Sequence, residues 1–394
     1  MSIKSIRKKI KRTYKNAIAD IKYIIFSNLF KSVKVKKNRI VFNNFNGKDF
    51  GDNPKYIAEE IIRQQLPYEL YWVTKKKAIH LPKEIKQIKV GSLKEAYIYA
   101  TSSIIICNTK QRLPFKKKKD QYYIQTWHGA FPLKLIEGEA EHLLPQRYVQ
   151  QSIEDSKITD LILSGSGILS KVIKESFWYQ GDILECGSPR DDIYFNQTSE
   201  SIKQIKTRLQ IPLNKKIVMY APTFRDNRKT DMYNLDFKQI LKALNQKTGE
   251  EWIFIVRLHP NISTRDHIFS YSENIINGSR YSDPQELFLL SDFLITDYSS
   301  VMMDFGIMEK PVILYTPDLE EYKKSRGIRP IFNQLPFPYA HTNAELIQMI
   351  LHFNENDYLN KLNHFIEEDY KNFSYGDASQ QVVKKIKEFI ENLN

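Results

Sequence analysis

From Arg39 onward, short apolar runs alternate with stretches of helical spacing, and this alternation limits the fold more than any other feature of the sequence. The apolar runs predict buried strands. Strands that alternate with helices predict parallel sheets with helices on both faces. The predicted strands are 40–42, 71–73, 103–107, 122–126, 160–163, 183–186, 216–220, 252–258, 293–296 and 312–315.

A polar, strand-poor stretch at 196–214 divides this alternation into two parts. The chain of 394 residues is long enough for two domains. We therefore predict two doubly wound Rossmann-type domains that face each other across a cleft, and ligands in such sheets bind at the carboxyl ends of the strands. The predicted divisions are 1–38, a basic amphipathic segment; 39–205 and 206–375, the two domains; and 376–394, a helix expected to pack back on the first domain.

The predicted helices include one that begins at Pro54, with Asn53 as its cap. Another opens at Gly165-Ser166-Gly167 and runs to about Trp178, and a third spans 299–308. Helical spacing also marks 93–100 and 380–393.

Most of the positive charge lies at the amino terminus. The net charge is +13, and residues 1–39 contain thirteen Lys or Arg and one acid, Asp20, so the rest of the chain adds only +1. Ile3, Ile10, Ala17 and Ile24 recur every seven residues, with basic residues mostly on other sides. This pattern predicts an amphipathic basic helix that docks on an anionic membrane surface. The basic residues expected at the membrane are Lys8, Lys9, Lys11, Arg12 and Lys15.

Two other interpretations of this segment are a solvated helix packed on the body and a nucleic-acid-binding arm. The near-neutral body argues against nucleic acid, because a binding face would spread basic residues over the fold. Lys116 to Lys119 follow Leu113-Pro114-Phe115, which suggests either a second membrane contact or a solvated charged loop. Cys107 and Cys186 have apolar neighbours that predict buried positions and a reduced, cytosolic setting.

Polar residues follow four of the predicted strands, where this class of fold concentrates its ligands. These clusters are Gln125-Thr126-Trp127-His128-Gly129, Ala221-Pro222-Thr223-Phe224-Arg225-Asp226, Arg257-Leu258-His259-Pro260-Asn261 and Thr296-Asp297-Tyr298-Ser299-Ser300. Each residue taken singly also has a purely structural interpretation as a turn, a cap or an ion pair. The coincidence of all four clusters with strand ends favours a binding site.

The residue types in these clusters suit transfer of a phosphate-bearing group. Ser299 and Ser300 open a helix whose free N–H groups could bind a phosphate. Arg257 and His259 could neutralise a pyrophosphate. His128, in the other half, could accept a proton near neutral pH. We therefore expect a nucleotide diphosphate donor in one half and a hydroxyl acceptor in the other.

The runs QTWHG, YAPTFRD, RLHPN and LITDYSSVMMDFGIMEKPVILY, together with FNNFNGKDFGDNPKYIAEEI, resemble the CDP-glycerol glycerophosphotransferases of teichoic acid synthesis. The resemblance covers roughly residues 40 to 327. It implies a GT-B-like fold and a peripheral enzyme on the cytoplasmic face of the cell membrane. It also implies transfer of glycerol phosphate from CDP-glycerol to an undecaprenyl-linked saccharide or growing teichoic acid chain, with release of CMP.

The resemblance assigns roles to particular residues. His128 and His259 match the family's two essential histidines, and Trp127 and Gly129 flank His128 on the acceptor side. Donor-binding positions then include Pro222, Thr223, Arg225, Arg257, Asp297, Ser299, Ser300 and Arg326. No Asp-x-Asp metal signature lies between a strand and a helix, so we expect no metal and no cofactor besides the CDP-polyol substrate.

Several alternatives stay open at this point. The donor could be CDP-ribitol, the product could be a capsule or other surface polymer, or the protein could be a GT-B glycosyltransferase that uses a nucleotide sugar. The segment after Ser325-Arg326-Gly327 departs from the family pattern, which leaves the polyol and acceptor preference open. The size suits a priming enzyme or a transferase that adds few units. Partners expected are the donor, the lipid-linked acceptor and the membrane surface, with no nucleic acid, and a homo-oligomer stays open.

Overall fold

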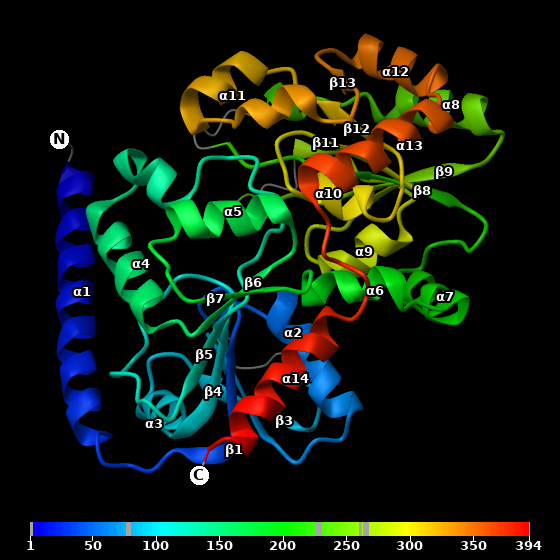
Figure 1. Ribbon diagram of the computed structural model, residues 1–394. Coiled ribbons are helices and arrows are strands. Elements are labelled where there is room, and N and C mark those ends of the chain that lie inside the picture. The colour runs from blue at the N-terminus through cyan, green and yellow to red at the C-terminus, as the bar shows by residue number, and fades with distance from the viewer. Residues whose placement is uncertain (1–2, 76–79, 226–230, 260–261, 263–267, 394) are drawn as a thin grey trace.

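The computed structural model of the protein describes residues 3–75, 80–225, 231–259, 262 and 268–393, without the side chains of 3–13, 15–16, 231 and 326. Two parallel sheets, each with helices on its faces, form two halves stacked one above the other (Figure 1). This arrangement confirms the predicted α/β fold of two doubly wound halves.

The sheet of the first half has seven strands, and every neighbouring pair is parallel. Strand β4 is buried along its whole length and β1 in its last five residues, because helices cover both faces of the sheet. In spatial order the strands are β3 (Ile85–Lys89), β2 (Glu69–Thr74), β1 (Lys36–Asn43), β4 (Ser102–Cys107), β5 (Tyr122–Gln125), β6 (Leu161–Ser164) and β7 (Asp182–Glu185). The sequence did not predict β3, an edge strand in which only Ile85 and Ile88 are buried.

The sheet of the second half has six parallel strands. In spatial order they are β10 (Ile275–Asn277), β9 (Trp252–Val256), β8 (Lys216–Tyr220), β11 (Phe293–Thr296), β12 (Val312–Tyr315) and β13 (Tyr339–Ala340). The two edge strands, β10 and β13, were missed because two or three residues do not make a detectable apolar run.

Helices surround both sheets. Those up to α6 are α1 (Ile3–Leu29), α2 (Asp52–Arg63), α3 (Leu93–Thr101), α4 (Gln146–Ile158), α5 (Gly167–Ser176) and α6 (Asp192–Phe195), with the 3₁₀ turns η1 (Glu137–Leu143) and η2 (Pro189–Asp191). The others are α7 (Ser199–Arg208), α8 (Phe237–Thr248), α9 (Pro284–Leu290), α10 (Val301–Gly306), α11 (Leu319–Arg326), α12 (Asn343–Leu351), α13 (Glu355–His364) and α14 (Ala378–Glu391), with the 3₁₀ turns η3 (Asp231–Tyr233) and η5 (Pro330–Gln334) and the π-helix η6 (Phe365–Tyr370).

The polar stretch at 196–214 contains α7, which Thr198 caps through the N–H of Ser201, and no strand is described in it. Two local predictions need correction. Helix α10 has six residues and is shorter than the predicted 299–308. Helix α2 begins at Asp52 with Gly51 before it, so Asn53 lies inside the first turn and does not cap the helix.

The chain crosses between the halves twice. After η6 it returns to the first half, where α14 lies beside the sheet in Figure 1. Ala378, Val382, Val383 and Ile386 of this helix join the apolar core that surrounds β1 and α2. The chain therefore leaves the second half and is anchored in the first half by the buried apolar side chains of α14.

A second connection comes from the segment that follows His128. Ala130, Phe131 and Leu133 are buried in the core of the second half, where Phe131 packs edge-on against Phe365 and Tyr370. The residues that directly follow His128, a predicted catalytic residue, therefore pack inside the other half. This insertion restricts how far the two halves can separate.

Candidate functional site

The four strand-end clusters are linked to one another across the two halves. In the second half, the N–H of Thr223 donates to both oxygens of Asp297, at 2.8 and 3.0 Å. The ring of Phe224 stacks on that of His259 with centroids 5.9 Å apart. Across the interface, a Cβ placed on Gly129 would lie 3.8 Å from Oγ of Ser300. Three turns of the second half and one of the first thus meet at one place.

His128 lies directly beyond β5 and is held in a defined orientation. Its Nδ1 lies 2.7 Å from the carbonyl oxygen of Asn108. A carbonyl can only accept, so Nδ1 carries the proton in this contact and Nε2 keeps a lone pair. The rings of Phe45 and Trp127 pack against the imidazole, with centroids 5.2 and 4.4 Å away. The geometry gives His128 the form of a general base.

The surroundings also keep His128 neutral. Burial lowers the pKa of His128 below its usual value of 6.5, and the charges of Arg190 and Lys48 lower it further. Asp52 and the hydrogen bond to Asn108 act in the opposite direction without overcoming the burial. A neutral imidazole near physiological pH can take a proton from an acceptor hydroxyl.

The backbone of the His128 turn is strained and is held by side chains for which the sequence did not predict this role. Trp127 has a φ of 51°, in the left-handed region that non-glycine residues rarely occupy. Asn53 Nδ2 donates to the carbonyls of Thr126 and Trp127, at 3.1 and 3.2 Å. Arg190 donates to the carbonyl of His128 at 2.9 Å. The local pattern marked Asn53 only as a helix cap and did not mark Arg190, because both act on a turn that is distant in the sequence.

Asn108 is a further residue that the sequence analysis missed, although a signal for it was present. It follows β4 directly, at the same sheet edge as His128, and is fully buried. Its side chain accepts from the N–H of Phe45 at 2.8 Å and donates to Asn44 at 2.7 Å. The strand-end rule that singled out His128 applies equally to Asn108.

Arg225 and Asp297 are paired with protein groups. Arg225 makes two hydrogen bonds to Asp318, at 2.7 and 3.0 Å, and an ion pair of 2.9 Å with Asp297. The rings of Tyr298 and Tyr322 lie near its guanidinium, at 4.9 and 4.6 Å. Arg225 is 5% exposed. This geometry favours a supporting role in which Arg225 shapes the turn.

Thr223 differs from its neighbours because its hydroxyl is unsatisfied. Among the described residues, the buried Oγ1 of Thr223 has no hydrogen-bond partner. A buried hydroxyl of this kind costs about 1–3 kcal/mol unless a ligand or water supplies the partner. Pro222, the preceding residue, is buried and keeps this strand end rigid.

Arg257 points toward the loop that follows β10. Its NH1 donates to the carbonyls of Gly278 and Tyr281, at 2.8 and 3.0 Å. Burial lowers the pKa of Arg257 to about 10, so the guanidinium stays charged at neutral pH. His259, two residues further on, is exposed, as a group that meets a ligand must be.

Ser299 and Ser300 are half-buried and precede α10. Oγ of Ser299 accepts from the N–H of Val301 at a long 3.5 Å. Tyr298, just before them, is completely buried and stacks on Tyr322 with centroids 3.9 Å apart. The two serine residues therefore follow a tyrosine that is fixed in place by burial and aromatic stacking.

The segment at 325–333, where the sequence departs from the family pattern, joins the two halves. The N–H of Leu135 donates to Gly327 at 3.3 Å, and the N–H of Arg329 donates to Leu133 at 3.0 Å. Arg329 also forms an ion pair with Glu139. These contacts give the segment a structural role between the halves. The side chain of Arg326 lies outside the described part of the structure.

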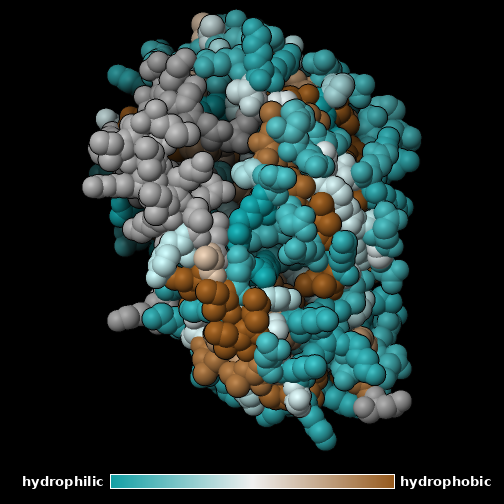
Figure 2. Space-filling view, turned by 90° about the vertical axis from the view of Figure 1, so that its left-hand side faces the viewer, coloured by the Kyte–Doolittle hydropathy of each residue, from teal (hydrophilic) through white to brown (hydrophobic). Residues whose placement is uncertain are grey.

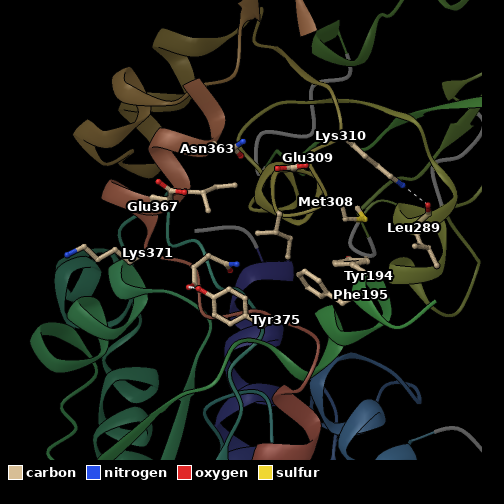
Figure 3. Close-up of a pocket in the computed structure, with 13 residues that line it drawn as sticks. Tyr194, Phe195, Leu289, Met308, Glu309, Lys310, Asn363, Glu367, Lys371 and Tyr375 are labelled. Carbon is tan, nitrogen blue, oxygen red and sulfur yellow. Dashed lines mark hydrogen bonds between the residues drawn. The ribbon is translucent and has the colours of Figure 1, made fainter. Parts of the chain in front are cut away.

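A cavity of about 860 Å³ also opens between the halves, but none of the predicted site residues lines it. Figure 3 shows Tyr194 and Phe195 of α6 on one side, with Glu367, Lys371 and Tyr375 on the other. Nζ of Lys310 turns to the carbonyl of Leu289 at 2.6 Å. The lining mixes acids, lysines and aromatic rings, so it specifies no class of ligand.

The described residues lack both a metal-binding cluster and a membrane-spanning helix. They contain no cluster of three or more His, Cys, Asp or Glu that could hold a metal ion. No helix in that part of the chain is long and apolar enough to span a bilayer.

Two parallel α/β domains whose strand-end turns meet across an interface define a GT-B-like transferase fold. The model of the family described as CDP-glycerol:poly(glycerophosphate) glycerophosphotransferase matches residues 24–388. The chain belongs to this family, which confirms the resemblance found in the sequence.

Similar proteins agree with this assignment. The teichoic acid poly(glycerol phosphate) polymerase of Bacillus subtilis is 32% identical over 89% of this chain, which spans about half the length of that relative (49%). The polymerase of the same description from Bacillus spizizenii is 30% identical over 97% of this chain and 100% of its own length. The teichoic acid glycerol-phosphate transferase of Staphylococcus aureus is 31% identical over 96% of this chain and 99% of its own. Because a relative of full matching length is called a polymerase, chain length does not separate priming from polymerisation.

A solved structure gives the same result. The wall teichoic acid polymerase TagF, in a variant soaked with CDPG, superposes with a TM-score of 0.85 and 29% identity, and the match covers 99% of each chain. An epimerase co-structure with UDP, MnaA of S. aureus, has a TM-score of 0.51 at 14% identity and shows the shared fold alone.

Proposed function

We propose that this protein transfers glycerol phosphate from CDP-glycerol to a saccharide or growing teichoic acid chain on a membrane-anchored undecaprenyl lipid, and releases CMP. The observation that carries the proposal is the orientation of His128. Its Nδ1 is bound to Asn108 and its neutral Nε2 is left as a proton acceptor, on a turn that touches Ser300 of the other half. Family membership supplies the substrate class.

In the proposed reaction, the acceptor hydroxyl attacks the β-phosphorus of CDP-glycerol in line. The bond from this phosphorus to the bridging oxygen breaks, and CMP leaves with the electron pair. His128 takes the hydroxyl proton. His259, Thr223 and the Ser299–Ser300 turn bind the donor phosphates, and Arg257 adds positive charge nearby.

The direct test is product formation from purified protein. CDP-glycerol and a lipid-linked disaccharide should give CMP and an acceptor heavier by one or more glycerol phosphates, measured by mass spectrometry. CDP-ribitol and UDP-sugars serve as parallel donors. Preference for CDP-ribitol would change the polyol, and transfer from a UDP-sugar alone would replace the proposal with glycosyl transfer.

Variants of the two histidines separate their roles. His128→Gln should lower kcat by about 10²–10⁴-fold, the usual share of a general base, and leave the Kd of CDP-glycerol unchanged. His259→Gln should weaken CDP-glycerol binding as well as turnover. His352→Gln is the control, since His352 is exposed directly after α12 and its Nδ1 contacts the carbonyl of Gln348 in that helix. Turnover of His128→Gln near the parent rate would remove His128 as the base.

We also propose that α1 docks the enzyme on an anionic membrane at the cytoplasmic face. Within the described part of α1, Ile18, Ile21, Ile24, Ile25 and Leu29 are between 37% and 59% exposed. Figure 2 looks at the side on which α1 lies and shows apolar surface gathered on the lower part of this face. An exposed apolar stripe of this kind is typical of an interfacial helix. Lys8, Lys9, Lys11, Arg12 and Lys15 belong to the same helix, but their side chains lie outside the described part.

Helix α1 is attached to the body by its other side. Asp20 forms ion pairs with Arg112 and Arg147, and Phe30 is buried near Tyr97. The apolar stripe therefore faces outward on a fixed helix, in contrast to the alternative of a helix that packs its apolar side on the body.

The second predicted membrane contact is wrong in its apolar part. Leu113 and Phe115 are each only 2% exposed and belong to the core of the first half. Lys117 pairs with Asp160, and Lys118 donates to the carbonyl of Val33. Lys118 thus holds the connection between α1 and β1, and Lys117 is fixed to the residue before β6.

A further inference from the structure

Arg190 is a buried arginine at the interface between the two halves. It lies in η2, after β7, and is 7% exposed. Burial of a guanidinium is costly unless several acceptors surround it. Each of its partners therefore indicates what the residue is there to hold.

One arm of Arg190 holds the turn that carries His128. NH1 donates to the carbonyl of His128 at 2.9 Å, and the backbone N–H of Arg190 donates to Oδ1 of Asn53 at 3.1 Å. The same Asn53 side chain donates to the carbonyls of Thr126 and Trp127. Because Trp127 has a left-handed backbone, the turn needs such contacts to keep its shape.

The other arm of Arg190 reaches the second half. NH2 lies 3.4 Å from Oδ1 of Asp304, in α10, the helix that directly follows Ser299 and Ser300. Asp52 lies 3.6 Å from NH1 and Asp191 lies 3.6 Å from Nε. A single guanidinium thus connects the His128 turn of one half to α10, the helix after Ser299 and Ser300, in the other half.

The surroundings of Arg190 suit positioning better than stability. Among the described residues, Nε of Arg190, Oδ1 of Asp191 and Oδ2 of Asp304 are buried without a hydrogen-bond partner. Buried charge clusters with unsatisfied atoms contribute little net stability, and some fix one arrangement of the chain. Three carboxylates around one arginine therefore indicate a geometric role.

We propose that Arg190 is a positioning residue for the transfer reaction. By binding the carbonyl of His128 and the carboxylate of Asp304 at once, it fixes the position of His128 relative to the donor-binding turn. The proposal rests on the proposed function. Arg190 touches no reacting atom, since its side chain is buried behind the turn. A misplacement of about 1 Å between reacting groups can lower a rate by about 10²-fold.

Turnover and donor binding should separate in the Arg190 variants. Arg190→Gln should lower kcat by about 10²-fold and change the Kd of CDP-glycerol, measured by calorimetry, by less than about threefold. Arg190→Lys keeps the positive charge and one donor group, so its kcat should be about tenfold higher than that of Arg190→Gln. Asp304→Asn should lower kcat, and its effect should not add to that of Arg190→Gln, because both remove one link.

Lys55→Gln is the matched control. Lys55 also makes a partly buried ion pair between the halves, 2.5 Å from Asp283, and among the described residues its ion pairs go to Glu59 and Asp283, outside the His128 turn. Its kcat should stay within about threefold of the parent. An equal loss in Lys55→Gln and Arg190→Gln would mean that the interface in general matters, and would overturn the proposal. So would a folded Arg190→Gln protein with kcat near the parent value, or one that loses donor affinity alone.

A distance measurement tests the positioning role without any substrate. Spin labels on Gln150→Cys in α4 and Lys324→Cys in α11 report the separation of the halves, because both sites are exposed and the native Cys107 and Cys186 are buried. Arg190→Gln should broaden the distance distribution, and an unchanged distribution would contradict the proposal. If the parent fails to release CMP from CDP-glycerol while Arg190→Gln still broadens the distribution, the proposed function fails and the link between the halves stands.

Discussion

Gly129 of the first half faces the hydroxyl of Ser300 in the second half, and a Cβ added at Gly129 would lie 3.8 Å from that oxygen. The contact joins the turn of the predicted base to the turn of the predicted donor site. It shows that the two strand-end clusters, whose contact residues are 171 positions apart in the sequence, lie next to each other.

This contact predicts a size limit at position 129. Gly129→Ala should fold and keep kcat within about tenfold, because 3.8 Å is ordinary van der Waals contact. Gly129→Leu should fill the space between the turns and lower kcat by about 10²-fold with an unchanged melting temperature. Steady-state kinetics and thermal melts check this. Equal activity of the two variants would show that no reacting group passes between these turns.

The pH dependence of turnover should report His128. Its pKa lies below 6.5, so the acidic limb of kcat/KM should have its midpoint below pH 6.5 and activity should be lost as pH falls through it. Lys48→Gln removes a positive charge that lowers this pKa, so the limb should move to higher pH. Lys94→Gln, at an exposed position of α3, serves as the control. A shift to lower pH in Lys48→Gln would exclude His128 as the titrating group.

The cluster around Arg190 predicts a pH-dependent stability. Burial, and then the charge of Asp304, raise the pKa of Asp191 to about 7, despite the opposing charge of Arg190. Because the pKa is higher in the folded state, protonation of Asp191 stabilises the fold fully at pH values below about 4, the pKa in the unfolded chain. This stabilisation is lost as pH rises toward 7. Asp191→Asn cannot ionise and keeps an oxygen that can accept from Ser374. Urea unfolding measures the free energy of unfolding of Asp191→Asn and of the parent. The difference, variant minus parent, should be higher at pH 8 than at pH 5 by on the order of 1 kcal/mol. The same difference at both pH values would contradict the assignment.

The exposed apolar stripe of α1 should control membrane binding. Ile21→Glu combined with Ile24→Glu places two charges on this stripe and should lower binding to vesicles with anionic lipid by at least about tenfold, because burial of each isoleucine contributes about 1.5–3 kcal/mol. Flotation of the protein with vesicles measures this. Leu213→Glu is the control, since Leu213 is 56% exposed on the second half. Parent-like flotation of the double variant would remove α1 as the docking surface.

Local sequence patterns determined much of the fold. Buried strands such as 216–220, 293–296 and 312–315 agree residue for residue with β8, β11 and β12, because a strand covered on both faces must be apolar throughout. The short edge strands β10 and β13 escaped detection, since half-exposed strands of two or three residues leave no such pattern. Strand ends also marked His128 and the donor-side turns, because parallel strands place their carboxyl ends at one edge.

The tertiary structure decided what each of these residues does. The family resemblance implied Arg225 as a donor-binding residue, and the fold pairs it with Asp318, 93 positions away. The local pattern predicted Asn53 as a helix cap, whereas the fold uses its amide to hold the His128 turn. Arg190 carried no signal at all. Strand and helix patterns arise from neighbours along the chain, whereas the partners of a buried polar group come from distant segments that only the packed fold brings together.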